Sequence, residues 1–309
     1  MKRPLPVDAR LTAIALAFRN PDVNLIGDMV LPRTPTDAEF KWLRHDLAQG
    51  YTVPDTKVGR KSVPNEVEFT GAEVSDSVDD HGLDDIVPNA DINDDNQGVD
   101  PLGKATMYTT SLVQLSREVR VAAKVFATGS YVAGNQQTLA GVSQWSDFAN
   151  SNPVDAILAA LDVPVMRPNI GTFGQQTWTK LRQHPKVVQA IKGTDQGAGA
   201  VTRREFADFF ELQEIYIGAG FINTAKKGQA VALSRCWGKH AAFTYRDRTA
   251  GPQNGMTYGF TAQAAPLQTA LIDAPSVGVE GAKRVRVYER VKEIVCAPEL
   301  GYFFQNAIA

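Results

Sequence analysis

The chain has 309 residues, of which 43% are hydrophobic and 21% are charged, a composition typical of a globular protein with one elaborate domain or two. A formal net charge of -2 argues against wholesale adhesion to nucleic acid or membrane surfaces. The two cysteines, Cys236 and Cys296, are too few for a disulfide framework, and no apolar run is long enough to span a membrane.

Residues 1–38 have the pattern of an arm rather than of a domain. They contain five prolines around one short helix, which we expect at residues 8–18. The arm also carries apolar side chains that need a surface to lie on, either the core of the same chain or a neighbouring molecule. These residues are Leu25, Ile26, Met29, Val30 and Leu31.

Residues 39–78 contain three extended runs, at 40–43, 51–58 and 66–74. Apolar and polar residues alternate along the third run with a period of two, which predicts a strand with one polar face. The turn-forming segment 59–65 separates the second run from the third. The pattern therefore predicts a long two-stranded excursion, which needs support because an isolated ribbon is marginal in water. Its tip is cationic through Lys57, Arg60 and Lys61.

Acidic residues are concentrated between positions 73 and 100. Calcium binding is one hypothesis for this acidic segment, but residues 91–98 lack the glycine register and the closing glutamate of an EF-hand loop. The pattern favours a solvated acidic loop or an electrostatic partner for basic groups. The acidic residues are Glu73, Asp76, Asp79, Asp80, Asp84, Asp85, Asp91, Asp94, Asp95 and Asp100.

The clearest periodicity in the sequence predicts a long helix over residues 101–127, roughly 37 Å from end to end at 1.5 Å per residue. Asp100 is its expected N-cap, Pro101 suits the first turn, and Gly129 lies just beyond its end. The main apolar stripe consists of Ala105, Tyr108, Leu112, Leu115, Val119, Ala122 and Phe126. A second row consists of Val113, Val121 and Val125, and we expect water around Arg117, Glu118, Arg120 and Lys124.

The remainder of the chain has the pattern of a mixed α/β unit that ends in sheet. We expect a helix from Asn152 and Pro153 to Leu161, a buried strand over residues 162–169, and a helix capped by Thr172. A capping box at residues 202–205 predicts a further helix, and strands are expected at 214–218, 230–235, 241–245 and 284–304.

No pattern in the sequence predicts an enzyme active site. Nucleophile elbow, zinc-protease and dinucleotide-binding motifs are absent from the sequence. Asp84 and Asp85 are neighbours whose side chains point apart, and Cys236 with His240 lacks the further ligands that zinc requires. We therefore expect no catalytic residues, no metal site and no cofactor, as suits a shell or interaction protein.

Seven short segments, taken in order, resemble those of the major capsid proteins of tailed phages, which have the Hong Kong 97-like (Johnson) fold. The similarity covers nearly the whole chain. The segments are YTVPD (51–55), HGLDDIVP (81–88), LSREVRVA (115–122), QWSD (144–147), RPN (167–169), LRQHP (181–185) and GFTAQ (259–263).

The resemblance implies an α+β fold with four parts. Residues 1–38 would be the N-terminal arm, 39–78 the extended E-loop, 79–166 with 278–309 the peripheral domain that holds the spine helix, and 167–277 the axial domain. The implied function is self-assembly, as hexamers and pentamers, into the icosahedral head that encloses double-stranded DNA. The implied location is the virion capsid, assembled in the cytoplasm of a bacterial host.

The resemblance also implies partners. Because the arm is too short to hold a built-in scaffold, we expect a separate scaffolding protein, together with a portal and a decoration protein, non-specific contact with packaged DNA, and no membrane. We further expect the basic tip of the E-loop, Lys57, Arg60 and Lys61, to meet acidic groups of adjacent subunits. The candidate acidic groups are Asp76, Asp79, Asp80, Asp84 and Asp85.

Two alternative functions remain open from the sequence. An encapsulin-like compartment shell would share the fold and differ in its cargo. A soluble oligomeric α/β enzyme could use the acidic segment to hold a metal ion.

Overall fold

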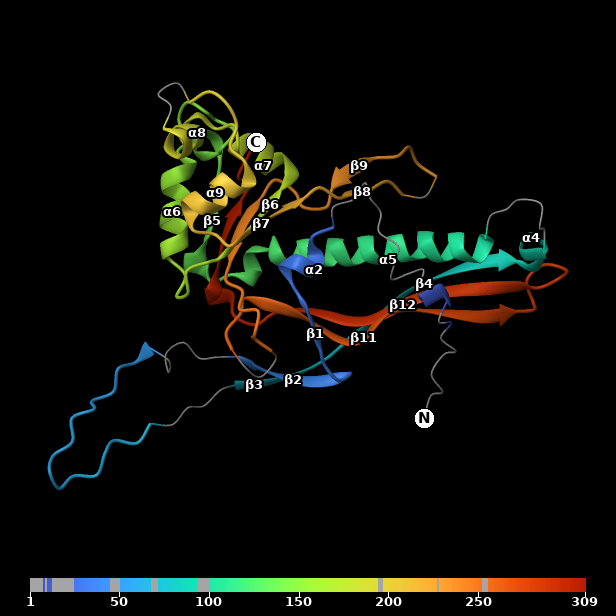
Figure 1. The fold of residues 1–309 in the computed structure, drawn as a ribbon, viewed down its shortest axis with the longest axis horizontal. Helices are drawn as coiled ribbons and strands as arrows, with labels where there is room; N and C mark the ends of the chain where they lie inside the picture. Colours follow the sequence, from blue (N-terminus) through green and yellow to red (C-terminus); the bar gives the residue numbers. More distant parts are fainter. Residues whose placement is uncertain are drawn as a thin grey trace.

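The computed structural model describes residues 8, 10–12, 25–44, 51–67, 72–93, 100–193, 197–226, 228–251 and 255–309. Figure 1 shows an elongated sheet with a long helix along one face, joined at one end to a more compact sheet with several helices. A thin loop extends away from both. No helix in the described ranges is long and apolar enough to cross a membrane.

The elongated sheet has four strands in the order β1 (Arg33–Pro35), β11 (Gly259–Ala274), β12 (Ala282–Val295) and β4 (Asp79–Pro88). β1 runs parallel to β11, and the other neighbours are antiparallel. β11 and β12 form a long hairpin that brings the later part of the chain back beside β4. The acidic residues from Asp79 to Asp85 therefore lie in a strand rather than in a loop.

The long helix α5 (Pro101–Val125) confirms the predicted spine helix, and the Asp100 side chain accepts a hydrogen bond from the Leu102 N–H as its N-cap. It packs against β12 and β4. The predicted main stripe is only partly buried, however: Ala105 and Ala122 are buried, but Tyr108 is 62% exposed and Leu112 is 55% exposed. The helix instead buries its second row, with threonines and two charged residues. The buried side chains are Ala105, Thr106, Thr109, Thr110, Val113, Arg117, Glu118, Val121, Ala122 and Val125.

The compact sheet has five strands, in the order β5 (Gln136–Thr138), β13 (Gly301–Gln305), β10 (Ala241–Thr244), β6 (Ile170–Gly174) and β7 (Glu214–Gly218). Four helices pack with it: α6 (Pro153–Asp162), α7 (Gln175–Leu181), α8 (Pro185–Lys192) and α9 (Arg203–Phe210). Aromatic side chains dominate the shared core, where Phe173, Trp178 and Phe206 contact one another.

The sheets do not follow the domain boundaries expected from the sequence. β11 lies within residues 167–277 but pairs with β12 of the elongated sheet, whereas β13 lies within 278–309 but pairs with β10 of the compact sheet. Boundaries drawn along the sequence could not predict this arrangement, because β11 and β13 each pair with a strand from the other expected domain.

One predicted helix cap is confirmed, and one predicted strand is wrong. The capping box is confirmed, since the Thr202 hydroxyl accepts from the Glu205 N–H and the Glu205 carboxylate accepts from the Thr202 N–H. The strand expected at residues 162–169 is wrong, because α6 runs to Asp162 and β6 begins at Ile170. Thr172, which was expected to cap a helix, lies within β6 instead.

Smaller elements complete the fold. β2 (Glu39–Arg44) pairs with β3 (Ala72–Ser77), and β8 (Phe221–Asn223) pairs with β9 (Leu233–Arg235). Short helices are α2 (Gly27–Val30) and α4 (Asn89–Asn93), and 3₁₀ turns are η2 (Thr128–Ser130), η3 (Ala133–Asn135), η4 (Gly141–Ser143) and η5 (Pro298–Leu300).

Candidate assembly interface

The expected E-loop, residues 39–78, consists of the β2–β3 ribbon and a loop that extends away from the rest of the chain. Figure 1 shows residues 51–67 as an extended loop on the side opposite to the long helix. The Ser62 N–H donates to the Gly59 carbonyl at 3.0 Å, which closes the predicted turn. The Asn65 side-chain amide donates to the Asp55 carbonyl at 2.8 Å and ties the two limbs together.

The predicted strand over residues 66–74 is formed only from Ala72, where β3 begins. Residues 66 and 67 lie outside any strand, and residues 68–71 fall outside the described ranges. The side chains of the expected cationic tip, Lys57, Arg60 and Lys61, are all exposed.

The E-loop also exposes apolar side chains. Val53 is 90% exposed and Val63 is 82% exposed, although β-branched residues are typical of packed strands. Tyr51, Val58 and Val67 are exposed as well. A loop with this composition gains by lying on another protein surface.

Three of the five acidic candidates already have basic partners within the same chain. Asp84 receives two hydrogen bonds from Arg286, at 2.6 and 2.7 Å, and lies 3.3 Å from Arg284. These hydrogen bonds from Arg286 hold the pKa of Asp84 below its usual value. Asp80 pairs with Arg290 at 2.6 Å, and Asp76 pairs with Lys292 at 2.6 Å.

The other two candidates lie on the opposite face of β4, because side chains alternate along a strand. Asp79 stands beside Val291 and Asp85 beside Val285, two buried residues of β12. Both aspartates are exposed, and neither forms an ion pair with any described residue. β4 is the last strand of its sheet, so its outer backbone edge has no strand partner in the described part of the chain.

The structure does not bring the basic tip and the acidic residues together within one chain. The loop extends away from the sheet that contains β4 (Figure 1). Among the described residues, no group of three or more histidine, cysteine, aspartate or glutamate side chains could hold a metal ion.

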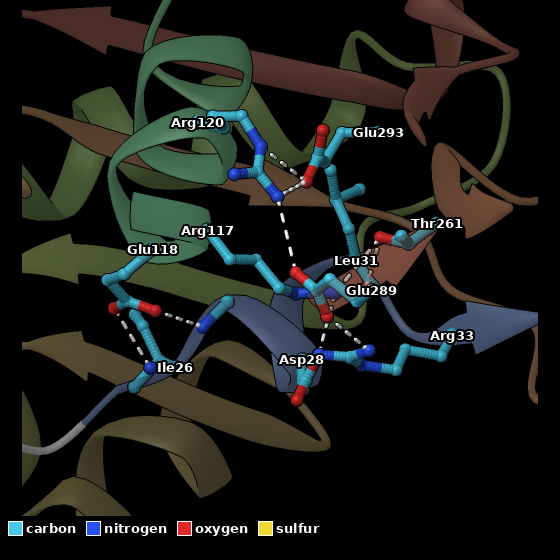
Figure 2. Close-up of polar contacts among 11 residues, drawn as sticks. Ile26, Asp28, Leu31, Arg33, Arg117, Glu118, Arg120, Thr261, Glu289 and Glu293 are labelled. Carbon is cyan, nitrogen blue, oxygen red and sulfur yellow. Dashed lines mark hydrogen bonds and ion pairs between the residues drawn. The ribbon is translucent and has the colours of Figure 1, made fainter. Parts of the chain in front are cut away.

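Sequence reasoning missed a buried cluster of charges where the arm meets the spine helix (Figure 2). Glu118 is 2% exposed, and its carboxylate accepts hydrogen bonds from the backbone N–H of Ile26 at 2.9 Å and of Gly27 at 2.7 Å. The indole N–H of Trp237 donates to the same carboxylate. Burial raises the pKa of Glu118, and these three donors oppose the rise.

The neighbouring Arg117 is also buried, and burial lowers its pKa. Its guanidinium lies 2.6 Å from the Asp28 carboxylate. It also donates to the Leu31 carbonyl at 3.3 Å and to the Thr261 hydroxyl at 3.1 Å. Arg117 therefore joins the arm, the spine helix and β11.

A third group extends this cluster to β12. Glu289 is 1% exposed and accepts from Arg33 at 2.8 Å. Arg120 lies between Glu289 at 3.4 Å and Glu293 at 3.1 Å. Burial acts to lower the pKa of Arg33, but the charges of Glu289 and Asp28 outweigh it and raise the pKa.

The arm therefore lies on the core of its own chain in the described residues. Ile26, Val30 and Leu31 are buried beside α5, whereas Met29 is half exposed. Further toward the N-terminus, the Asp8 N–H donates to the Thr269 carbonyl of β11 at 3.0 Å. Of the helix expected at residues 8–18, the structure describes only residues 8 and 10–12, and 10–12 are helical.

The expectation of water around Arg117 and Glu118 is wrong. Residues 113, 117, 121 and 125 are four apart, so Arg117 lies in the second apolar row itself. A charged residue in the middle of an apolar row was the available signal for a buried ion pair. The sequence could not reveal its partners, because Asp28 and Thr261 are distant in the chain.

Comparison with known proteins identifies the family of the chain. No family model matches the chain. It is 50% identical over 307 residues to the major capsid protein of Pseudomonas phage JBD67. The match covers 99% of this chain and 98% of that protein.

Two solved structures share the fold. A phage-related protein from Bordetella bronchiseptica RB50 has a TM-score of 0.76 at 20% identity, with 99% of each chain covered. The capsid structure of cyanophage P-SCSP1u has a TM-score of 0.58 at 10% identity, covering 93% of this chain and 89% of that one.

These relationships confirm the prediction of a phage shell protein and exclude the enzyme alternative. The fold is the expected α+β capsid fold, and the protein is a structural component of the virion rather than a catalyst. The chain belongs to the major capsid proteins of tailed phages, which have the Hong Kong 97-like fold and form the icosahedral head.

Proposed function

We propose that subunits of this capsid protein join by laying the E-loop of one subunit along the β4 edge of the next. The observation that carries the proposal is the exposed, extended loop of residues 51–67 with its cationic tip, which in Figure 1 extends away from β4 of its own chain. The contact would repeat throughout the hexamers and pentamers of the shell.

The acidic partners in this contact are Asp79 and Asp85. Asp76, Asp80 and Asp84 are neutralised by β12 of their own chain, so they attract a neighbouring cation less strongly. Asp79 and Asp85 have no such ion pair and lie on the last strand of the sheet. An exposed strand edge also offers free backbone groups to an extended segment, such as residues 51–58.

Each of these charge contacts is weak by itself. An exposed ion pair contributes about 0.2–1 kcal/mol and is screened by salt. The effect on a shell is much larger, because a subunit held by several contacts gains avidity from each one. Weak contacts also allow a misplaced subunit to leave before the shell closes.

The two sheets support a division of roles between the expected domains, with changed boundaries. We propose that the compact sheet and helices α6 to α9 form the axial domain at the centre of each hexamer or pentamer. The elongated sheet with the spine helix would be the peripheral domain. β11 then belongs to the peripheral domain, because it pairs with β12. β13 belongs to the axial domain, because it pairs with β10.

The remaining partners are also proposals. A separate scaffolding protein would guide shell size, a portal would occupy one vertex, and a decoration protein would bind the outside. The net charge of -2 supports non-specific enclosure of double-stranded DNA rather than tight binding to it. Expression with and without a candidate scaffold, compared by electron microscopy, tests the first of these.

Charge reversal tests the E-loop contact. We expect the double variant Arg60→Glu with Lys61→Glu to lose most of its shell yield, and the further changes Asp79→Lys and Asp85→Lys to restore part of it. The matched control is Lys104→Glu with Lys124→Glu, which makes the same charge change at exposed positions of the spine helix. Sedimentation and negative-stain microscopy measure the yield. Wild-type yield from the Arg60 and Lys61 variant would contradict the proposal.

A further inference from the structure

The β8–β9 hairpin has the character of a second contact element. Its strands have three residues each, and Figure 1 shows it extending from the compact sheet to one side of the domain. Its outer apolar side chains face water, with Leu233 65% exposed and Val231 70% exposed. A ribbon this short is marginal alone, so exposed apolar groups on it point to a protein partner.

The hairpin has a defined shape at its base and turn. The Asn223 side chain accepts from the N–H groups of Ala225 at 3.1 Å and Ala232 at 3.0 Å. The Arg235 guanidinium lies 3.7 Å from the centre of the Phe221 ring and also donates to the Ala219 carbonyl. Phe221 and Arg235 therefore form one flat surface that is both apolar and positively charged.

The charge of this region has one sign. Residues 215–246 include five lysines and arginines and no aspartate or glutamate. Lys226 and Arg235 are the basic residues of the hairpin in its described part. A partner for this surface must therefore be apolar and acidic.

A surface of that kind lies on the same domain, at the ends of α6 and α9. Its exposed apolar residues are Val163, Val165 and Phe209. Its acidic residues Asp162, Asp208 and Glu211 have side chains that are 71%, 73% and 73% exposed. Asp208 also lies 3.8 Å from Arg204 of its own helix, and such an exposed pair is weak enough to leave the carboxylate available to a neighbouring cation. Arg167 bridges Asp162 at 2.7 Å and Glu211 at 3.4 Å, which joins the two helix ends into one surface.

The hairpin and the helices that carry this surface lie on different sides of the compact sheet. In Figure 1, α6 and α9 lie on the left of the compact sheet, whereas β8 and β9 extend to the right above α5. The two surfaces of one chain are thus placed for contacts with two different neighbours. Head-to-tail contacts of this kind generate closed rings when the rotation between copies closes.

We propose that the β8–β9 hairpin of one subunit docks on the helix-end surface, α6 with α9, of the next copy around a hexamer or pentamer. Lys226 would face Asp208 and Glu211, and Leu233 would pack against Val163 and Val165. The proposal rests on the self-assembly of this chain, but it uses none of the residues of the E-loop contact. It assigns the ring contact of the axial domain to a specific pair of surfaces.

A charge exchange tests the pairing. We expect Lys226→Glu and Asp208→Lys each to lower the yield of rings and shells several-fold, and the combined variant to recover most of the wild-type yield. The control is Lys104→Glu, an exposed charge reversal on the spine helix. Circular dichroism of the free subunits checks that each variant folds. Wild-type yield from both single variants, or no recovery in the combined one, would overturn the proposal.

Disulfide trapping gives a readout that does not depend on yield. Leu233→Cys and Val163→Cys are prepared as separate proteins, mixed and oxidised, and the products are separated on a non-reducing gel. We expect a linked dimer in the mixture that neither variant forms alone. Its absence in a mixture that still assembles would overturn the hairpin contact. This crosslink does not involve the E-loop, so we expect it to form even if the proposed E-loop contact is wrong.

Discussion

At the scale of single residues, Glu118 shows how a buried charge is made tolerable. A carboxylate accepts hydrogen bonds only, and all three groups directed at it here are N–H donors. Two donors come from the arm and one from Trp237, near the compact sheet, so one side chain of the spine helix fixes two distant segments. Gly27 gives the carboxylate its room, because an added Cβ would lie 2.8 Å from a Glu118 carboxylate oxygen and force it to shift.

His184 is a second buried residue whose state is fixed by its neighbours. Its Nδ1 accepts from the Lys186 N–H at 3.3 Å and caps α8, so its proton is on Nε2, which lies 3.0 Å from the Ser151 hydroxyl. Burial lowers the pKa of His184, and the charge of Lys186 adds to this effect. A second proton on Nδ1 would face the Lys186 N–H and break the cap.

This geometry predicts a loss of stability in acid. The unfolded chain, with a histidine pKa of about 6.5, takes up the proton before the folded chain does. Stability from neutral His184 is therefore complete above pH 6.5 and is lost as the pH falls toward the lower folded value. We expect His184→Asn, which keeps a capping oxygen, to weaken this dependence. Urea unfolding of free subunits between pH 8 and pH 5 measures it, and equal slopes would contradict the expectation.

At the scale of elements, the spine helix shows what periodicity can and cannot decide. Its existence, its N-cap and its length follow from local sequence. The choice of buried face does not, because both apolar rows satisfy the helical period. The structure buries Val113 in a cluster with valines of β12, and Val121 in the cluster that holds Ile26 and Leu31 of the arm. From the other row, Tyr108 and Leu112 remain in water.

The choice of face predicts a contrast between two similar substitutions. Val121→Ala removes two buried methyl groups, and we expect a loss of about 2 kcal/mol in the free energy of unfolding of the free subunit. Leu112→Ala removes an exposed side chain, and we expect a change within about 0.5 kcal/mol. Urea titration measures both. A larger loss from Leu112→Ala would mean that the exposed stripe is buried in the free subunit.

Strands were predicted less well than helices, for a physical reason. A helix is stabilised by neighbours three and four residues away, so its signals are local. The strands β11 and β12 also lie close in sequence, but β4 comes from far upstream in the chain. Only the pairing of β4 with β12 decides which acidic side chains form ion pairs with arginines. The acidic residues were thus identified, whereas their division between two faces was not.

At the scale of the whole molecule, the protein separates a stable body from elements that reach outward. The arm is held on the body by Glu118 and Arg117, so its described part stabilises the chain itself. The E-loop and the β8–β9 hairpin expose apolar and basic groups to water. The excursion of residues 39–78 was predicted from its extended runs and its basic turn, but the helix-end surface required the fold, since α6 and α9 are distant in the chain.

This separation predicts that residues 51–67 can be removed without harm to the subunit. A flexible glycine and serine linker of the same length keeps the cost of loop closure nearly constant and deletes only exposed side chains. We therefore expect the same urea midpoint as the wild-type subunit, together with no closed shells in negative-stain microscopy. The linker variant keeps its own β4 edge and can still accept the loop of a wild-type neighbour. Mixed with an excess of wild-type subunits, it should enter shells, whereas its exclusion from them would show that the loop organises the subunit itself.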